Sequence, residues 1–102
     1  MLTFWLMANE YHISRQVLYS GLYSDETIRE FLDWLNEIGY NSQDVTHCVI
    51  YTPTATRPGC VQAYVFQRDK DGNIKTFNGD AVTVVRSRWF IGLCPLLKGK
   101  GR

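Results

Sequence analysis

Two arginines, Arg86 and Arg88, interrupt one of the most apolar stretches of the chain, residues 82–94 with the sequence VTVVRSRWFIGLC. In a strand, residues two apart share one side, so these two guanidinium groups can act on a common target. Guanidinium groups pair with carboxylates or phosphates through two hydrogen bonds, and they also stack on rings. The spacing therefore indicates a recognition surface on this strand.

Histidine and cysteine are the residue types in this chain that could support covalent catalysis. His47 and Cys48 are adjacent, so a strand points them to opposite faces and they do not form a dyad. Cys60 follows a turn-rich loop, where His12 or His47 beside it would make it a nucleophile. A cysteine without such a neighbour is more often a small buried core residue. We expect the chain not to be an enzyme, and we keep a small cysteine-dependent or nuclease-like enzyme as the second alternative.

Patterns for metal ions and cofactors are incomplete in the sequence. Zinc sites pair cysteine or histidine ligands about two to four residues apart, and the chain has no such pair. Asp69, Asp71 and Gly72 resemble part of a calcium loop whose closing glutamate is missing. The chain also has no glycine-rich phosphate loop. We expect no metal ion and no cofactor.

The length and composition are those of a small globular domain. The chain has 102 residues, of which 45% are hydrophobic and 14% aromatic. That share of rings exceeds what one small core holds, so some rings are expected at the surface, where they indicate contact with a partner. Three cysteines without a close pair are typical of free thiols in a reducing compartment. The apolar N-terminal run is too short to span a bilayer, so we expect a cytoplasmic protein without membrane contact.

The net charge of +1 hides a strong asymmetry along the chain. Residues 24–44 carry six acidic residues against one base, whereas residues 45–102 carry nine bases against three acids. Joined acidic and basic segments favour electrostatic contact with another macromolecule.

Residues 24–39 (SDETIREFLDWLNEIG) predict a helix over 25–38. Ser24 is a good N-cap, acidic residues occupy the first turn, and Gly39 stands where a left-handed residue ends a helix. Apolar residues at the helical period form one stripe: Ile28, Phe31, Leu32, Leu35 and Ile38. Acidic residues line the outer face and make a second candidate binding face: Glu26, Glu30, Asp33 and Glu37. That face is either simply solvated or the contact for a basic partner.

The remaining segments predict strands. We expect a hairpin from residues 2–7 and 11–19, then strands over 46–52, 60–68, 73–77 and 81–91, with turns at Gly72 and Asn78-Gly79-Asp80. The order is ββαββββ, which predicts an α+β domain over 1–97. Its sheet is mainly antiparallel, with about five or six strands and the helix on one face. We expect residues 98–102 to form a flexible basic tail.

Period-two alternation predicts which side chains share a face of the sheet. In strand 81–91 the set with Trp89 and Val85 makes an uncharged core face, which places Arg86, Arg88 and Phe90 outward. The predicted binding surface combines these three with rings and cations of the preceding hairpin: Tyr64, Phe66, Arg68, Lys75 and Phe77. The opposite assignment, with the rings inside and the small residues outside, stays open because register is not visible in a sequence.

Rings mixed with cations fit two kinds of partner. Single-stranded nucleic-acid binders stack bases on rings and meet phosphates with cations, so RNA or single-stranded DNA binding is the first alternative. The RNA-recognition motif does not match, because Gln67 stands where its last ring is required and a second helix is missing. Arginine among rings is equally the composition of protein–protein hot spots. A net charge near zero favours a protein partner.

We therefore expect a small intracellular protein-binding module that acts as an inhibitor or adaptor by occupying a partner's surface. Compact α+β proteins without a catalytic motif are frequent among phage and mobile-element proteins that block host machinery, anti-CRISPR proteins among them. This is an analogy of type, carried by size and composition rather than by a motif. The sequence leaves the oligomeric state open.

Overall fold

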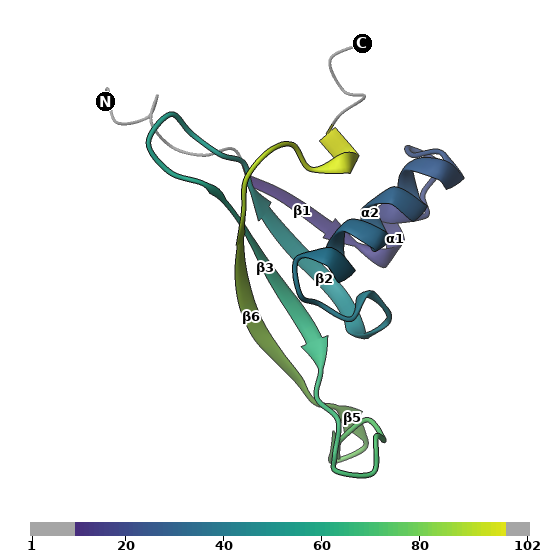
Figure 1. Cartoon of the computed structure of the whole chain (residues 1–102). Coiled ribbons are helices and arrows are strands. Elements are labelled where there is room, and N and C mark those ends of the chain that lie inside the picture. The colour runs from purple at the N-terminus through teal and green to yellow at the C-terminus, as the bar shows by residue number, and fades with distance from the viewer. Residues whose placement is uncertain (1–9, 98–102) are drawn as a thin grey trace.

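The computed structural model describes residues 10–97, which form a four-stranded sheet, a two-stranded hairpin and one main helix (Figure 1). In chain order the elements are β1 (Glu10–Ser14), α1 (Arg15–Leu18), α2 (Asp25–Glu37), the 3-10 turn η2 (Ser42–Asp44), β2 (Val45–Tyr51), β3 (Gly59–Phe66), β4 (Thr76–Phe77), β5 (Asp80–Ala81), β6 (Thr83–Phe90) and the 3-10 turn η3 (Pro95–Leu97). This arrangement confirms the predicted α+β class. No helix within residues 10–97 is long and apolar enough to cross a membrane.

The signals read from the sequence at both ends of α2 operate in the structure. The Ser24 hydroxyl accepts a hydrogen bond from the Thr27 amide at 3.1 Å, which satisfies a backbone donor of the first turn. The helix ends at Glu37, and Gly39 follows with φ of +112°, a conformation that favours glycine. The prediction of a helix over 25–38 is confirmed to within one residue at its end. Its apolar stripe is buried as expected, at Ile28, Phe31 and Leu35.

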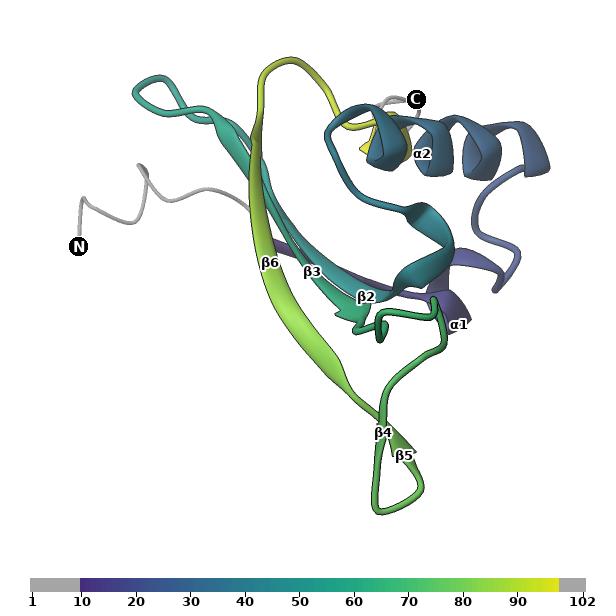
Figure 2. The same ribbon diagram turned by 60° about the horizontal axis from the view of Figure 1, so that its bottom comes forward.

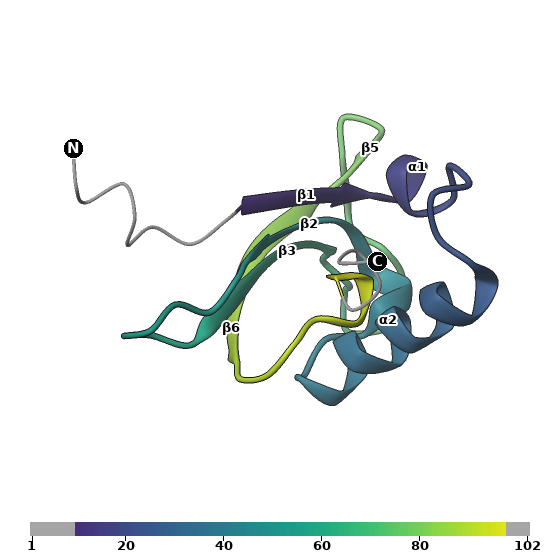
Figure 3. The same ribbon diagram turned by 90° about the horizontal axis from the view of Figure 1, so that it is seen from above.

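The sheet has the strand order β1-β2-β3-β6, and every pairing in it is antiparallel. Helix α2 and η3 lie against one face, which Figures 2 and 3 show on the concave side of the curved sheet. Buried side chains of the sheet gather on that face: Ile13, Cys48, Ile50, Val61, Ala63, Val65 and Phe90. We call it the core face.

The chain between β3 and β6 projects beyond the sheet as an arm, residues 67–82 (Figures 1 and 2). The predicted pairing of residues 60–68 with 73–77 is reduced to a single bridge between Arg68 and Ile74. At the tip, β4 pairs with β5 through a turn in which Asn78 and Gly79 both have positive φ, of 54° and 87°. Two consecutive left-handed residues match the right-handed twist of a hairpin, which explains the Asn-Gly sequence. The described strands thus divide between two sheets, where one continuous sheet was expected.

The N-terminal hairpin prediction needs a correction. The strand expected over 11–19 stops at Ser14, whose hydroxyl accepts a hydrogen bond from the Val17 amide at 3.1 Å. That cap starts the short helix α1, and its residue Leu18 enters the core. The other predicted strand, residues 2–7, lies outside the described residues, as does the predicted tail 98–102.

The two sides of β6 are reversed relative to the prediction: the side predicted to face outward faces the core. Phe90 is buried, with 5% of its surface exposed, and Val84 packs against the core. Trp89 and Val85, which were assigned to the core, are 65% and 52% exposed. Phe90 therefore contributes to the core and leaves the predicted binding surface.

Arg86 and Arg88 share the core side of β6 with Phe90 and are nevertheless exposed. Their partners across the ladder, Ala63 and Val61, have no exposed surface at all. Arginine is tolerated on this side because β6 is an edge strand, and a long side chain there reaches water past the border of the sheet. The prediction rested on excluding charge from the core side, and that rule does not hold at an edge.

Candidate functional site

The face of the sheet opposite the core carries side chains from all four strands. We call it the open face because none of the described helices packs on it (Figures 2 and 3). Alternation and register assign to it Glu10, His12 and Ser14 of β1; His47, Val49 and Tyr51 of β2; Cys60, Gln62, Tyr64 and Phe66 of β3; and Thr83, Val85, Ser87 and Trp89 of β6. Two predicted binding residues, Tyr64 and Phe66, belong to this face.

A row of stacked rings crosses the open face. His12 stacks on His47 with centroids 5.9 Å apart, and His47 stacks on Tyr64 with centroids 5.3 Å apart and planes at 17°. Tyr64 is paired with Val85 on β6, so the row continues into an aliphatic side chain at the edge. Cross-strand stacking fixes the orientation of these rings relative to one another. This row could not be predicted from the sequence, because it depends on the register between strands.

Trp89 is the most prominent ring of the open face. It lies opposite Cys60 at the edge of the sheet and is 65% exposed. Directly after the strand, Ile91 and Leu93 are 86% and 58% exposed. Together with Val85, these side chains give the β6 side of the molecule a concentration of exposed apolar groups. Such concentrations in a soluble domain indicate contact with another molecule.

The open face has no lysine or arginine among its residues. Its one carboxylate, on Glu10, accepts a hydrogen bond from His12 at 2.7 Å. The face is therefore close to neutral and dominated by rings. Binding of phosphate groups relies on cations, and the two arginines of β6, Arg86 and Arg88, lie on the other side of the sheet.

Arg88 is held by the end of α2. Its Cζ lies 5.9 Å from the centroid of the Tyr40 ring. A Cβ placed on Gly39 would stand only 3.0 Å from the Arg88 Nε, so the guanidinium lies directly against the backbone there. Helix C-termini carry partial negative charge, which favours a cation at this place.

Tyr40 connects α2 to the β3–β6 ladder. Its hydroxyl lies 2.7 Å from the Val61 carbonyl oxygen and 2.8 Å from that of Arg86. Burial raises the pKa of the Tyr40 hydroxyl to about 12, although the positive charge of Arg88 acts in the opposite direction. The phenol is thus a neutral hydrogen-bond donor that fixes the position of β6 relative to α2.

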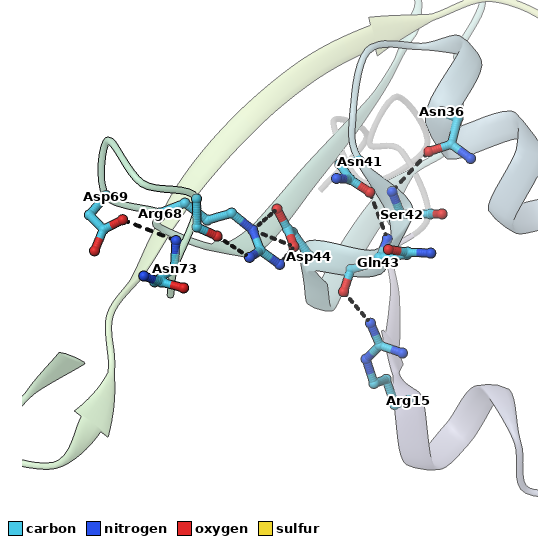
Figure 4. A network of polar contacts seen from close by, with 10 residues as sticks. Arg15, Asn36, Asn41, Ser42, Gln43, Asp44, Arg68, Asp69 and Asn73 are labelled. Carbon is cyan, nitrogen blue, oxygen red and sulfur yellow. Dashed lines mark hydrogen bonds and ion pairs between the residues drawn. The ribbon is translucent and has the colours of Figure 1, made fainter. Parts of the chain in front are cut away.

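Arg68 is bound within the molecule (Figure 4). Its Nη2 and Nε donate to the Asp44 carboxylate at 2.7 Å and 3.1 Å, and its Nη1 donates to the Gly72 carbonyl at 2.6 Å. The same hydrogen bonds hold the pKa of the Asp44 carboxyl below its ordinary value. Arg68 therefore joins the arm to η2, and its guanidinium is already paired.

The predicted binding surface is thus divided among separate places. Lys75 and Phe77 lie in the arm with Arg68, and Phe77 is 71% exposed. Tyr64 and Phe66 lie on the open face. Arg86 and Arg88 lie at the edge of the core face, and Phe90 lies inside the core. On the open face the structure places Tyr64 beside His47 and opposite Val85, and Trp89 lies farther along β6, opposite Cys60.

The second candidate face remains a single surface in the structure. Its four acidic side chains are all exposed along the outer side of α2: Glu26, Glu30, Asp33 and Glu37. The ion pairs within residues 10–97 join Asp44 to Arg68 and Glu10 to His12, so they use none of these carboxylates.

The three cysteines are free thiols in surroundings that disfavour the thiolate. Burial raises the pKa of Cys48 to about 12 and that of Cys94 to about 11, and it also raises the pKa of Cys60. A raised thiol pKa lowers the fraction of the nucleophilic form at neutral pH. His47 and Cys48 lie on opposite faces, as their adjacency predicted.

A small, partly open pocket lies between α1, α2 and the start of β2. Two of its polar side chains are used within the fold. The Ser14 hydroxyl caps α1, and Arg15 donates to the Gln43 carbonyl oxygen at 2.9 Å. Within residues 10–97, no group of three or more His, Cys, Asp or Glu side chains could hold a metal ion.

No protein-family model matches the chain, and no curated protein or solved structure shows a significant similarity to it.

Proposed function

We propose that this chain is a small protein-binding module whose open face docks on a protein partner. The observation that carries the proposal is the exposure of Trp89, Val85 and Tyr64 on a sheet face that has no cation. Tryptophan and tyrosine dominate protein–protein hot spots, because they bury a large area at a small cost in conformational entropy. A partner that covers the open face would remove these side chains from water.

The charge distribution supports a protein partner over a nucleic acid. A strand of RNA or DNA on the open face would place its phosphates on a surface without lysine or arginine. The stacked row of His12, His47 and Tyr64 is the observation that favours the nucleic-acid alternative, because bases stack on such rings. Stacking without phosphate contacts leaves out the larger part of nucleic-acid affinity.

We further propose that the module works in the cytoplasm as an inhibitor or adaptor that blocks its partner by occupying a surface. Three free thiols, two of them buried, support a reducing compartment. The raised thiol pKa values support a binding role over cysteine-dependent catalysis. The analogy of type with phage and mobile-element proteins, anti-CRISPR proteins included, supports the role of inhibitor by size and composition alone.

A site-specific crosslinking experiment tests the proposal. A photo-crosslinking amino acid replaces Ser87, at the centre of the β6 side of the open face, and a matched control carries it in place of the exposed Lys70 in the arm. After illumination in lysate of the native host, one protein should be crosslinked from position 87 and not from position 70. Nuclease treatment should leave the product intact, and Trp89→Ala should abolish it. A nuclease-sensitive product, or equal products from both positions, would contradict the proposal.

A further inference from the structure

Strand β6 forms one border of the four-stranded sheet and pairs only with β3 among the described strands. The Gln67 amide donates to the Val82 carbonyl at 2.9 Å, which makes 67 and 82 a hydrogen-bonded pair. Such pairs alternate along an antiparallel ladder, so the even-numbered residues of β6 turn their backbone groups toward β3. The odd-numbered residues turn their backbone N–H and C=O groups toward the border: Thr83, Val85, Ser87 and Trp89.

This border is long for an unpaired edge. β6 spans 8 residues and has no proline, and unpaired edges are usually kept short or are interrupted. A row of outward-facing backbone donors and acceptors is a template for one more strand. The side chains beside it therefore determine which strand fits.

The two sides of β6 differ in chemistry at the border. On the open face the odd-numbered positions present Val85 and Trp89, which are exposed and apolar. On the core side the even-numbered positions present the exposed Arg86 and Arg88. A strand that fits this border carries apolar side chains on one side and acidic side chains on the other.

Neither arginine has a carboxylate partner within residues 10–97, where the ion pairs are Asp44–Arg68 and Glu10–His12. Every Asp and Glu of the chain lies in that range. The backbone N–H and C=O groups of Arg86 and Arg88 point toward β3. Residues placed opposite them on an added strand therefore occupy non-hydrogen-bonded positions. Side chains of paired strands come closest at those positions, which suits ion pairs.

A second copy of the chain is a poor occupant of this border. When β6 pairs antiparallel with itself along most of its length and with matching faces, Arg86 or Arg88 stands opposite Arg86 or Arg88 of the other copy. Like charges directly opposite each other destabilise a strand pair. Charges at an edge are also a recognised protection against self-association. The border therefore selects a partner strand of different charge.

We propose that β6 accepts an extended segment of the partner protein as an added antiparallel strand. Carboxylates at two alternating positions of that segment face Arg86 and Arg88, and apolar side chains lie against Val85 and Trp89. The inference rests on the proposed function and specifies the chemistry of the partner. Main-chain hydrogen bonds supply affinity in this mode of recognition, and the alternating side chains supply specificity.

A peptide titration tests strand addition directly. The probe is a blocked peptide of 8 residues, the length of β6, in which glutamate and valine alternate. Binding to the full ¹⁵N-labelled protein should shift the backbone amides of Thr83, Val85, Ser87 and Trp89 and slow their hydrogen exchange. The same peptide with lysine in place of glutamate should bind at least about tenfold more weakly. Equal affinity for both peptides, or shifts confined to other elements, would overturn the inference.

A charge reversal provides a second test of strand addition. Arg86→Glu should remove most of the preference for the glutamate peptide, because the new carboxylate repels glutamate while Arg88 still attracts it. Lys70→Glu makes the same change of charge in the arm, and it should leave the preference as in the wild type. The dispersion of the amide spectrum checks that both variants are folded. An unchanged preference in a folded Arg86→Glu variant would overturn the inference.

The outcomes separate this inference from the proposed function. A protein that crosslinks from position 87 and is lost on Trp89→Ala supports the open face. If that protein is retained by Arg86→Glu and neither peptide binds, the open face stands and strand addition fails. If the glutamate peptide binds along β6 while no protein crosslinks from position 87, strand addition stands and the proposed function fails.

Discussion

The guanidinium of Arg88 lies over the ring of Tyr40, with its Cζ 5.9 Å from the ring centroid, and covers the backbone at Gly39. Helix α2 has no basic residue in its own last turn, so Arg88 supplies from β6 the cation that a helix C-terminus favours. Arg86, two residues earlier, has no described ring contact or ion pair through its guanidinium. The two arginines therefore differ in role although they share one side of one strand.

Removing each arginine separately should reveal this difference. Arg88→Ala should lower the free energy of unfolding by about 0.5–1 kcal/mol, because it removes a cation from the helix end and from the Tyr40 ring. Arg86→Ala should leave the free energy of unfolding within about 0.5 kcal/mol of the wild type. Urea denaturation of both variants measures the two values. Equal losses in the two variants would contradict the assignment of roles.

Tyr40 should make the stability of the protein fall at alkaline pH. Burial raises its pKa from the ordinary value of 10.0 to about 12, so the unfolded chain loses this proton at a lower pH than the folded protein. The contribution is fully present below about pH 10 and is lost as the pH rises toward 12, by about 2–3 kcal/mol. Urea denaturation at a series of pH values measures the slope.

Tyr40→Phe isolates that contribution. At neutral pH the variant should lose about 1–2 kcal/mol, because the hydroxyl hydrogen that the Val61 and Arg86 carbonyl oxygens share disappears. Its alkaline slope should be shallower than that of the wild type. Some slope remains, since the raised pKa values of Cys48 and Cys94 act with the same sign. Tyr19→Phe, at a side chain that is 57% exposed, should leave the slope unchanged.

Gly59 should not tolerate a side chain. A Cβ at this position would lie 2.3 Å from the Phe90 Cζ, and Phe90 is itself held edge-on by Trp34 at 5.0 Å. Gly59→Ala should therefore cost about 1–3 kcal/mol, the usual penalty for overpacking a core. Thermal denaturation measures the loss. The double change Gly59→Ala, Phe90→Leu should cost less than the sum of the single changes, and simple additivity would contradict the contact.

The acidic face of α2 should contribute to function more than to folding. The variant changes the four acidic residues of this face to lysine: Glu26, Glu30, Asp33 and Glu37. We expect it to remain folded and to bind its partner with reduced affinity. These side chains are exposed, so their effect on folding is limited to small terms at the first helical turn. Circular dichroism checks that the variant is folded. The amount of partner protein that the variant captures by crosslinking, relative to the wild type, reports the change in binding. Unchanged capture would mean that the face is only solvated.

Local signals explain what could be predicted from the sequence. Helix α2 could be predicted from its N-cap at Ser24, the helical spacing of its apolar residues and the glycine at position 39 that follows it. Each of these signals acts over a few neighbouring residues. The Asn78-Gly79 turn is equally local, since its two positive φ angles are a property of those residue types. The Ser14 cap is also local, but the expectation of a continuous strand concealed it.

The face that each side of β6 presents is not a local property. Both sides of β6 alternate plausibly, and the core side is decided by Phe90 packing over Gly59 and against Trp34, far away in sequence. The prediction assumed that the core side of β6 carries no charged residue, and it therefore chose the wrong side. An edge strand lets Arg86 reach water from the core side. The open face depends in turn on register across β1, β2, β3 and β6, which alternation alone leaves undetermined.

Adjacent residues at the end of β6 allow a direct test of this phase and of the proposed surface together. Phe90→Ala removes a buried ring that contacts Trp34, and it should cost about 3–5 kcal/mol of stability. Trp89→Ala removes a ring that is 65% exposed, and it should change stability by less than about 1 kcal/mol.

Partner binding should show the opposite order at these two positions. Trp89→Ala should weaken binding by about 2 kcal/mol or more, the usual loss at a hot spot, in a protein that remains folded. The milder change Phe90→Leu, which keeps an apolar side chain in the core, should leave the affinity close to that of the wild type. Urea denaturation measures the stability of each variant. Titration with the partner protein that crosslinking identifies measures its affinity. If Trp89→Ala destabilises the fold while leaving binding intact, Trp89 belongs to the core, and the open face is not the contact surface.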